Sequence, residues 1–163
     1  MLSFKNIKQK QAGFTLLEVL LVVAIIAILA GIVIIAINPG KNLGDARNAQ
    51  RSADVNTIIN GTYQYVLDNN GVLPTVGARS GAVAISATPT EICSTSAVAC
   101  TGLVDLTVLT ASGKYIVALP KDPQCPTGCN ANGVGYTIAS TTGNRLIVNA
   151  PGAENGKTIS VTK

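Results

Sequence analysis

The sequence contains no histidine and no tryptophan, and aromatic side chains make up only 4% of its 163 residues. Without histidine the chain lacks the usual general base, the usual activator of a nucleophile and the commonest metal ligand in proteins. It also lacks paired catalytic acids, and residues 77–81 do not have the spacing of a phosphate-binding loop. We therefore expect a protein that is not an enzyme and needs no cofactor, with a core built from Val, Ile, Leu and Ala.

Charged residues are also scarce, at 12% of the chain, and the formal net charge is +4. Three of the twelve basic residues, Lys5, Lys8 and Lys10, lie near the N-terminus, before any acidic residue. The remainder of the chain has nine basic and eight acidic residues, which gives it a net charge of +1. Because a nucleic-acid surface needs clustered positive charge, the composition predicts no specific nucleic-acid partner.

A long apolar run follows the basic segment. Residues 19–37 carry no polar side chain, and only Thr15 and Glu18 interrupt the apolar character of residues 14–37. As a helix this segment would be about 36 Å long, enough to cross a hydrocarbon core of about 30 Å. The preceding lysines predict a single span with its N-terminus in the cytoplasm. A secretory signal peptide and an ordinary single-span anchor are the alternatives; the former has a shorter apolar region and a small-residue cleavage site.

Residues 13–18, Gly-Phe-Thr-Leu-Leu-Glu, together with the basic segment and the apolar run, resemble the prepilin motif of bacterial type IV pilins and of the pseudopilins of type II secretion. The resemblance is close in the N-terminal quarter of the chain and extends to the remainder in layout only. It implies cleavage between Gly13 and Phe14 by a membrane prepilin peptidase, and N-methylation of the new Phe14 amine. Residues 1–13 would be a cytoplasmic leader peptide, and residues 14–37 would form the transmembrane and filament-core helix.

A charged Glu18 side chain has a high free-energy cost in lipid, and a charge at such a position usually marks a functional site. A buried carboxylate needs a partner or becomes protonated, and apart from Thr15 the neighbours of Glu18 are apolar. The amine that cleavage would create at Phe14 is a candidate, either in the same chain or in a neighbouring copy. The resemblance favours the pair between copies, which would set the axial step of a helical filament. A Glu18 that reaches up to the membrane surface is the simpler alternative.

Residues 38–70 are predicted to be an amphipathic helical segment, with helical character from 43 to 68 and a stop at the Asn-Asn-Gly sequence at 69–71. At the Asn-Pro-Gly sequence at 38–40 the preceding helix either kinks or stops and restarts. The apolar positions recur at helical spacing and are Val55, Ile58, Ile59, Thr62 and Val66. The positions predicted to form a solvated face are Asp45, Arg47, Arg51 and Asp54.

The rest of the chain is predicted to form a variable loop region, residues 71–113, and an antiparallel sheet with the C-terminal region, residues 114–163. A short helix or strand is expected around 103–109, strands at 115–119, 134–139 and 145–149, a further strand at 158–162, and a hairpin turn at 143–144. The predicted fold class is α+β: a long N-terminal helix, transmembrane in its first half and amphipathic in its second, packed on a small antiparallel sheet. This is the layout of the type IV pilin fold.

Four cysteines, Cys93, Cys100, Cys125 and Cys129, follow the apolar run. An exported domain favours disulfides, and we favour the two local pairs because Pro and Gly between positions 125 and 129 could bring the ends of that segment together. Crossed pairing stays open. A four-thiolate zinc site is a further alternative, although the spacing of the first two cysteines is too wide for it.

Asp122 lies in a segment, residues 119–123, that resembles a region near which pseudopilins can have a calcium loop. Calcium needs several oxygen ligands, and Glu154 is the only acidic residue after Asp122. Asp122 is therefore a weak calcium candidate, and the plainer interpretation is a proline-stiffened turn with no metal.

The leading functional hypothesis is a structural subunit, a major or minor pilin, of a type IV pilus-like filament that serves motility, adhesion or DNA uptake. The resemblance implies a homo-oligomeric helical filament, a prepilin peptidase and methyltransferase, an inner-membrane platform protein and an assembly ATPase as partners. It also implies a single-pass inner-membrane protein before assembly and an extracellular pilus afterwards. The alternatives are a pseudopilin of a type II secretion system and a membrane-anchored binding domain that does not polymerise.

Overall fold

The computed structural model describes residues 13–74, 79–125, 127–143 and 145–163. The chain divides into two units, of which the first ends at Gly40 and the second begins at Lys41. Nearly all of the expected leader, residues 1–12, and one residue of the expected hairpin turn, Asn144, lie outside the described residues.

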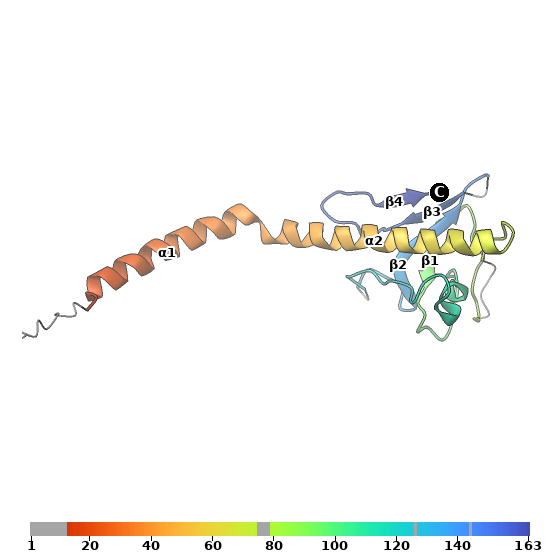
Figure 1. Ribbon diagram of the computed structural model, residues 1–163, viewed down its shortest axis with the longest axis horizontal. Helices are drawn as coiled ribbons and strands as arrows, with labels where there is room; N and C mark the ends of the chain where they lie inside the picture. The colour runs from red at the N-terminus through yellow and green to blue at the C-terminus, as the bar shows by residue number, and fades with distance from the viewer. Residues whose placement is uncertain (1–12, 75–78, 126, 144) are drawn as a thin grey trace, which may run out of the picture. The chain divides into compact units, whose positions relative to one another are not determined.

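The first unit contains helix α1, Leu16–Ile37 (Figure 1). None of its side chains is buried. The helix is long and apolar enough to cross a membrane. Its large apolar side chains are all exposed, and such a surface is unfavourable in water, so α1 needs lipid or other helices around it. Asn38 ends the helix with a left-handed φ of 44°, a conformation that asparagine tolerates better than most residues.

The second unit begins on helix α2, Pro39–Asp68, whose first residue is a proline, a favoured residue at the first helical position. The predicted apolar face is confirmed at Val55, Ile58 and Ile59, which are buried, whereas Val66 is only half-buried. The predicted stop is also confirmed. Gly71 has a φ of 84° and donates its N–H to the Val66 carbonyl at 2.8 Å, which satisfies a carbonyl of the last turn.

Four strands form one antiparallel sheet in the order β1-β2-β3-β4, and α2 packs against it (Figure 1). The strands are β1 Thr90–Cys93, β2 Gly133–Ser140, β3 Leu146–Asn149 and β4 Ser160–Thr162. The buried side chains of β2, including Tyr136 and Ile138, meet the apolar face of α2 in one core. The α+β fold class and the predicted strands at 134–139, 145–149 and 158–162 are confirmed, with shorter bounds for the last two.

Two predictions about the sheet are wrong: the strand at 115–119 is absent, and the predicted loop region 71–113 contributes a strand. Residues 115–119 do not form a strand, although Ile116 and Leu119 are buried, because their apolar and β-branched character reports burial rather than pairing. The strand beside β2 is instead β1, which comes from the predicted loop region and has an irregular register between Glu91 and Cys93. The short helix or strand expected around 103–109 is a 3₁₀ segment that lies slightly later, η1 at Thr107–Gly113, with a break at residues 111 and 112.

Candidate functional site

The bond predicted to be cleaved lies just outside α1. Gly13 and Phe14 precede the helix, and Thr15 is its N-cap with an extended backbone at φ −77° and ψ 149°. Phe14 is 86% exposed. The Gly13–Phe14 peptide is therefore accessible and non-helical, as a scissile bond must be for a protease to bind the chain around it.

Glu18 has a partner within its own helix. The Thr15 hydroxyl accepts a hydrogen bond from the Glu18 N–H at 3.2 Å, and the Glu18 carboxylate accepts from the Thr15 N–H at 3.2 Å and from the Thr15 hydroxyl at 3.4 Å. This is a capping box, which satisfies two backbone donors and places a negative charge at the positive end of the helix. The expectation that Glu18 lacks a local partner is therefore corrected, and the Thr-x-x-Glu spacing was the signal for Thr15 in the sequence.

The same carboxylate borders an apolar groove. A shallow groove of about 390 Å³ on α1 is lined by Phe14, Glu18, Val19, Val22 and Val23. The structure thus brings together the two residues predicted for assembly, Phe14 and Glu18, on one surface. A carboxylate beside apolar side chains can accept a charge-assisted hydrogen bond from an ammonium group.

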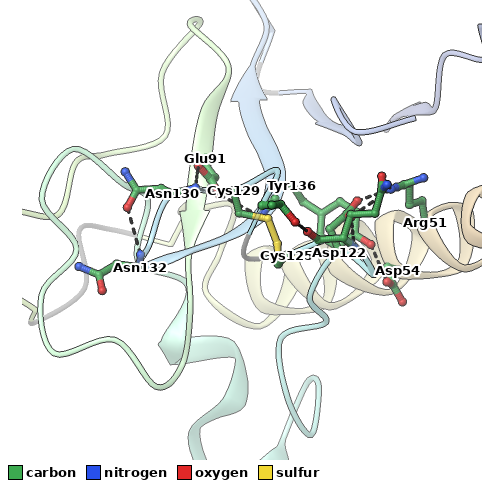
Figure 2. Close-up of a disulfide and its surroundings, with 12 residues drawn as sticks. Arg51, Asp54, Glu91, Asp122, Cys125, Cys129, Asn130, Asn132 and Tyr136 are labelled. Atoms are coloured by element: carbon green, nitrogen blue, oxygen red, sulfur yellow. Dashed lines mark hydrogen bonds and ion pairs between the residues drawn. A yellow bond between two sulfur atoms is a disulfide. The ribbon is translucent and has the colours of Figure 1, made fainter. Parts of the chain in front are cut away.

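A buried charge network forms a second cluster, in the second unit (Figure 2). Arg51 is fully buried and donates to Asp122 at 2.6 and 3.1 Å, to Glu154 at 2.9 Å, to Gln124 at 2.7 Å and to Asn48 at 3.1 Å. The predicted solvated face of α2 is therefore wrong at Arg51, because the segments around Asp122 and Glu154 cover that side of the helix. It is also wrong at Asp54, which is 5% exposed.

The Glu154 carboxylate binds two arginines, Arg47 and Arg51. It accepts from Arg47 twice at 2.6 Å, and from Arg51. The hydrogen bonds from Arg47 and then Arg51 lower the pKa of Glu154 to about 2. The same bond to Glu154 raises the pKa of Arg47. Since all three groups stay charged at neutral pH, the network fastens the loop that carries Glu154 to the first half of α2.

Asp54 and Tyr136 link α2 to the central strand. The Tyr136 hydroxyl donates to the Asp54 carboxylate at 2.6 Å, and the Gln50 amide donates to the other carboxylate oxygen at 2.7 Å. Burial and then the bond to Asp54 raise the pKa of Tyr136. This gives a buried polar contact between β2 and α2 beside the apolar core.

Asp122, the weak calcium candidate, is bound to a cation of the protein itself. Both of its oxygens accept from Arg51, and one also accepts from the Gln124 N–H at 2.8 Å. The nearby Glu154 carboxylate also accepts its hydrogen bonds from arginines. Among the described residues no group of three His, Cys, Asp or Glu side chains lies close enough to hold a metal ion. The structure therefore places Asp122 in an ion pair, where a guanidinium takes the role of the cation.

The four cysteines form two local disulfides, Cys93–Cys100 and Cys125–Cys129, with Cα–Cα distances of 5.6 and 5.5 Å. The first is fully buried, whereas both cysteines of the second are half-buried. The first lies next to Arg79, which donates to the carbonyls of Ser94 and Ala97 inside the disulfide loop. Arg79 is held in turn by Asp105 at 2.7 Å.

The pKa of Asp105 reflects the same contact. Burial alone would raise the pKa of this carboxyl, but hydrogen bonds from Arg79 and Thr107 hold it well below its usual range. Asp105 is therefore a carboxylate at neutral pH and can keep Arg79 in place beside the first disulfide.

Comparison with known proteins identifies the N-terminal segment. Residues 8–34 match the family model described as the prokaryotic N-terminal methylation motif. Over 63 residues the chain is 40% identical to "Type II secretion system core protein G" of Aeromonas hydrophila, a match that covers 39% of this chain and 43% of that relative. No solved structure matches the chain significantly. Residues 8–34 of this chain therefore carry the prokaryotic N-terminal methylation motif, which confirms the prepilin-type resemblance of residues 13–18.

Proposed function

We propose that this chain is a structural subunit that polymerises through α1 into a pilus-like filament after removal of its leader. The observation that supports this most directly is a methylation motif, residues 8–34, that includes most of the fully exposed apolar helix α1. In the proposal the Gly13–Phe14 bond is cleaved, the Phe14 amine is N-methylated, and residues 14–37 remain as the membrane anchor. The anchor lies in the inner membrane before assembly, with its N-terminus in the cytoplasm.

The proposed assembly contact joins Glu18 of one copy to the Phe14 amine of the next. Both charges are costly in an apolar environment when alone, and together they form a charge-assisted hydrogen bond. Such a contact uses different surfaces on the two copies, so its repetition builds an open helical filament. Before assembly, the capping box with Thr15 would keep the carboxylate of a membrane-stored subunit hydrogen-bonded.

The filament would act mechanically and would have no active site. Its proposed partners are a prepilin peptidase with methyltransferase activity, an inner-membrane platform protein and an assembly ATPase. As an extracellular pilus it would serve motility, adhesion or DNA uptake.

A second candidate is a pseudopilin, a subunit of a short filament inside a type II secretion system. The 40% identity to the Aeromonas type II secretion protein over 63 residues favours it. Imaging of cells at native expression separates the two candidates. Long surface fibres that contain this chain support a pilin, whereas their absence together with a secretion defect on deletion supports a pseudopilin.

The test of the proposed function is the mass of the mature N-terminus together with assembly of a Glu18→Ala variant. We expect N-methylated Phe14 at the mature N-terminus of both proteins, and loss of filaments in the variant alone. Val98→Ala, at an exposed position of the second unit outside α1, is the control and should assemble. An uncut leader, cleavage beyond Ala36, or normal filaments from Glu18→Ala would overturn the proposal.

A further inference from the structure

We propose that the Cys125–Cys129 disulfide is a site of thiol–disulfide exchange with an external dithiol, while Cys93–Cys100 is inert under the same conditions. Opening this disulfide would loosen the segment that holds Arg51. This inference concerns the second unit alone and does not depend on filament assembly.

The two disulfides differ in access. Exchange requires a thiolate to reach a disulfide sulfur. Cys93 and Cys100 are fully buried in a small apolar cluster with Leu103, and Arg79 bonds to two carbonyls of the loop between them. Cys125 and Cys129 are half-buried, and the residues between them that the structure describes, Thr127 and Gly128, are exposed. The second disulfide therefore lies nearer the surface of the folded domain than the first, and we infer that a thiolate reaches it without the local unfolding that the first requires.

The Cys125–Cys129 disulfide joins two anchored stretches of chain (Figure 2). On one side, Asp122 and Gln124 accept hydrogen bonds from the buried Arg51 of α2, and the Cys125 N–H donates to the Asp122 carbonyl at 3.0 Å. On the other side, the Asn130 N–H donates to the Glu91 carboxylate of β1 at 3.2 Å. The disulfide is thus a direct covalent link between a segment bound to α2 and a segment bound to β1.

The sulfurs lie against the central strand with little room to move toward it. A Cβ placed on Gly135 of β2 would lie 2.7 Å from the Cys129 sulfur and 3.1 Å from the Cys125 sulfur. Two thiols cannot stay at the S–S bond length of about 2 Å and must separate to van der Waals contact. Because the sulfurs have little room on the side of β2, we expect reduction to move at least one cysteine away from that strand, together with the anchored residues beside it.

The chemistry is an ordinary two-step exchange. A thiolate of the dithiol attacks one of the two sulfurs, the S–S bond breaks, and the released cysteine thiolate takes up a proton. The second thiolate of the dithiol then attacks the mixed disulfide and releases the other cysteine, which is also protonated. The protein gains two electrons and two protons, and the dithiol leaves as its cyclic disulfide.

The experiment treats the detergent-solubilised full chain with dithiothreitol, blocks thiols with N-ethylmaleimide at intervals and maps the labels by peptide mass spectrometry. We expect Cys125 and Cys129 to be labelled faster than Cys93 and Cys100 by at least about tenfold, since buried sulfurs react only after local opening. Equal rates, or faster labelling of Cys93 and Cys100, would overturn the proposal.

Hydrogen exchange on the partly reduced protein tests the structural consequence. We expect faster exchange of the Cys125 and Asn130 amides, while the amides of β3 keep their protection. Exchange that rises equally throughout the sheet would mean that reduction requires global unfolding, which contradicts a local site. A Cys125→Ser/Cys129→Ser double variant should reproduce the local increase without reductant, and unchanged exchange in that variant would also count against the coupling to Arg51.

Discussion

At the scale of single residues, Arg51 shows what a sequence pattern cannot predict. Charged side chains are rarely fully buried, so the helical period assigns Arg51 to the solvent. Its partners Asp122 and Glu154 lie 71 and 103 positions away in the chain. Asp122 and Glu154 reach α2 only through the tertiary fold, so the local sequence around Arg51 cannot predict that they cover it. By contrast, the motif that contains Gly13, Phe14 and Glu18 can be recognised in the sequence because it is contiguous, and the capping-box spacing indicates Thr15.

Loss of Arg51 should cost far more stability than loss of Arg47. We expect Arg51→Met to lower the free energy of unfolding by about 3–5 kcal/mol, because it leaves buried Asp122 without its counter-charge. Arg47→Met is the control, since Arg47 is partly exposed and Glu154 keeps its bond to Arg51. Urea denaturation of the two variants measures the difference, and equal losses would contradict a buried role for Arg51.

Acid should destabilise the domain through Glu154. The pKa of Glu154 is lowered to about 2 in the folded state, so its contribution to stability is fully present above its ordinary pKa near 4.5. That contribution is lost as the pH falls from about 4.5 toward 2. We expect the melting temperature to drop across this window, and less steeply in Glu154→Gln. A variant with an unchanged slope would show that Glu154 does not carry the effect.

At the scale of elements, the sequence predicts the helices and strands that have long, regular patterns and does not predict the short strand β1. The apolar run predicts α1, the helical period predicts α2, and β-branched and aromatic residues predict β2. β1 has four residues and an irregular register, so it offers no periodic signal, and the buried residues 116 and 119 mimic a strand in an irregular segment. Which segment pairs with the edge of β2 depends on the whole sheet, and local propensity does not contain that information.

The close approach of Gly135 to the second disulfide gives a test at this scale. Gly135 has a φ of 83°, and its missing Cβ would lie 2.7 Å from both the Asp122 Cβ and the Cys129 sulfur. We expect Gly135→Ala to lower the free energy of unfolding by about 1–3 kcal/mol through overpacking and backbone strain. Gly128→Ala is the control, because nothing lies within 4 Å of its Cβ position, and it should change stability by no more than about 0.5 kcal/mol. Similar stabilities of the two variants would contradict tight packing at Gly135.

At the scale of the whole molecule, the carboxylates divide into two groups. The seven in the second unit all have hydrogen bonds or ion pairs within that unit, for example Asp45 with Lys157 and Asp68 with Lys114. Glu18 differs because it lies on a helix with no basic residue and, within the part of the chain that the structure describes, has hydrogen bonds only with Thr15. It is therefore the acidic side chain best placed to take a counter-charge from another copy, and the proposed filament depends on it.

The most direct measurement is a high-resolution cryo-electron microscopy map of the native assembly that contains this chain. The account predicts the Glu18 carboxylate of one copy within about 3 Å of the Phe14 nitrogen of a neighbouring copy, repeated along the fibre axis. A map in which Glu18 stays bonded only to its own Thr15, or faces water with the Phe14 amine elsewhere, would contradict it.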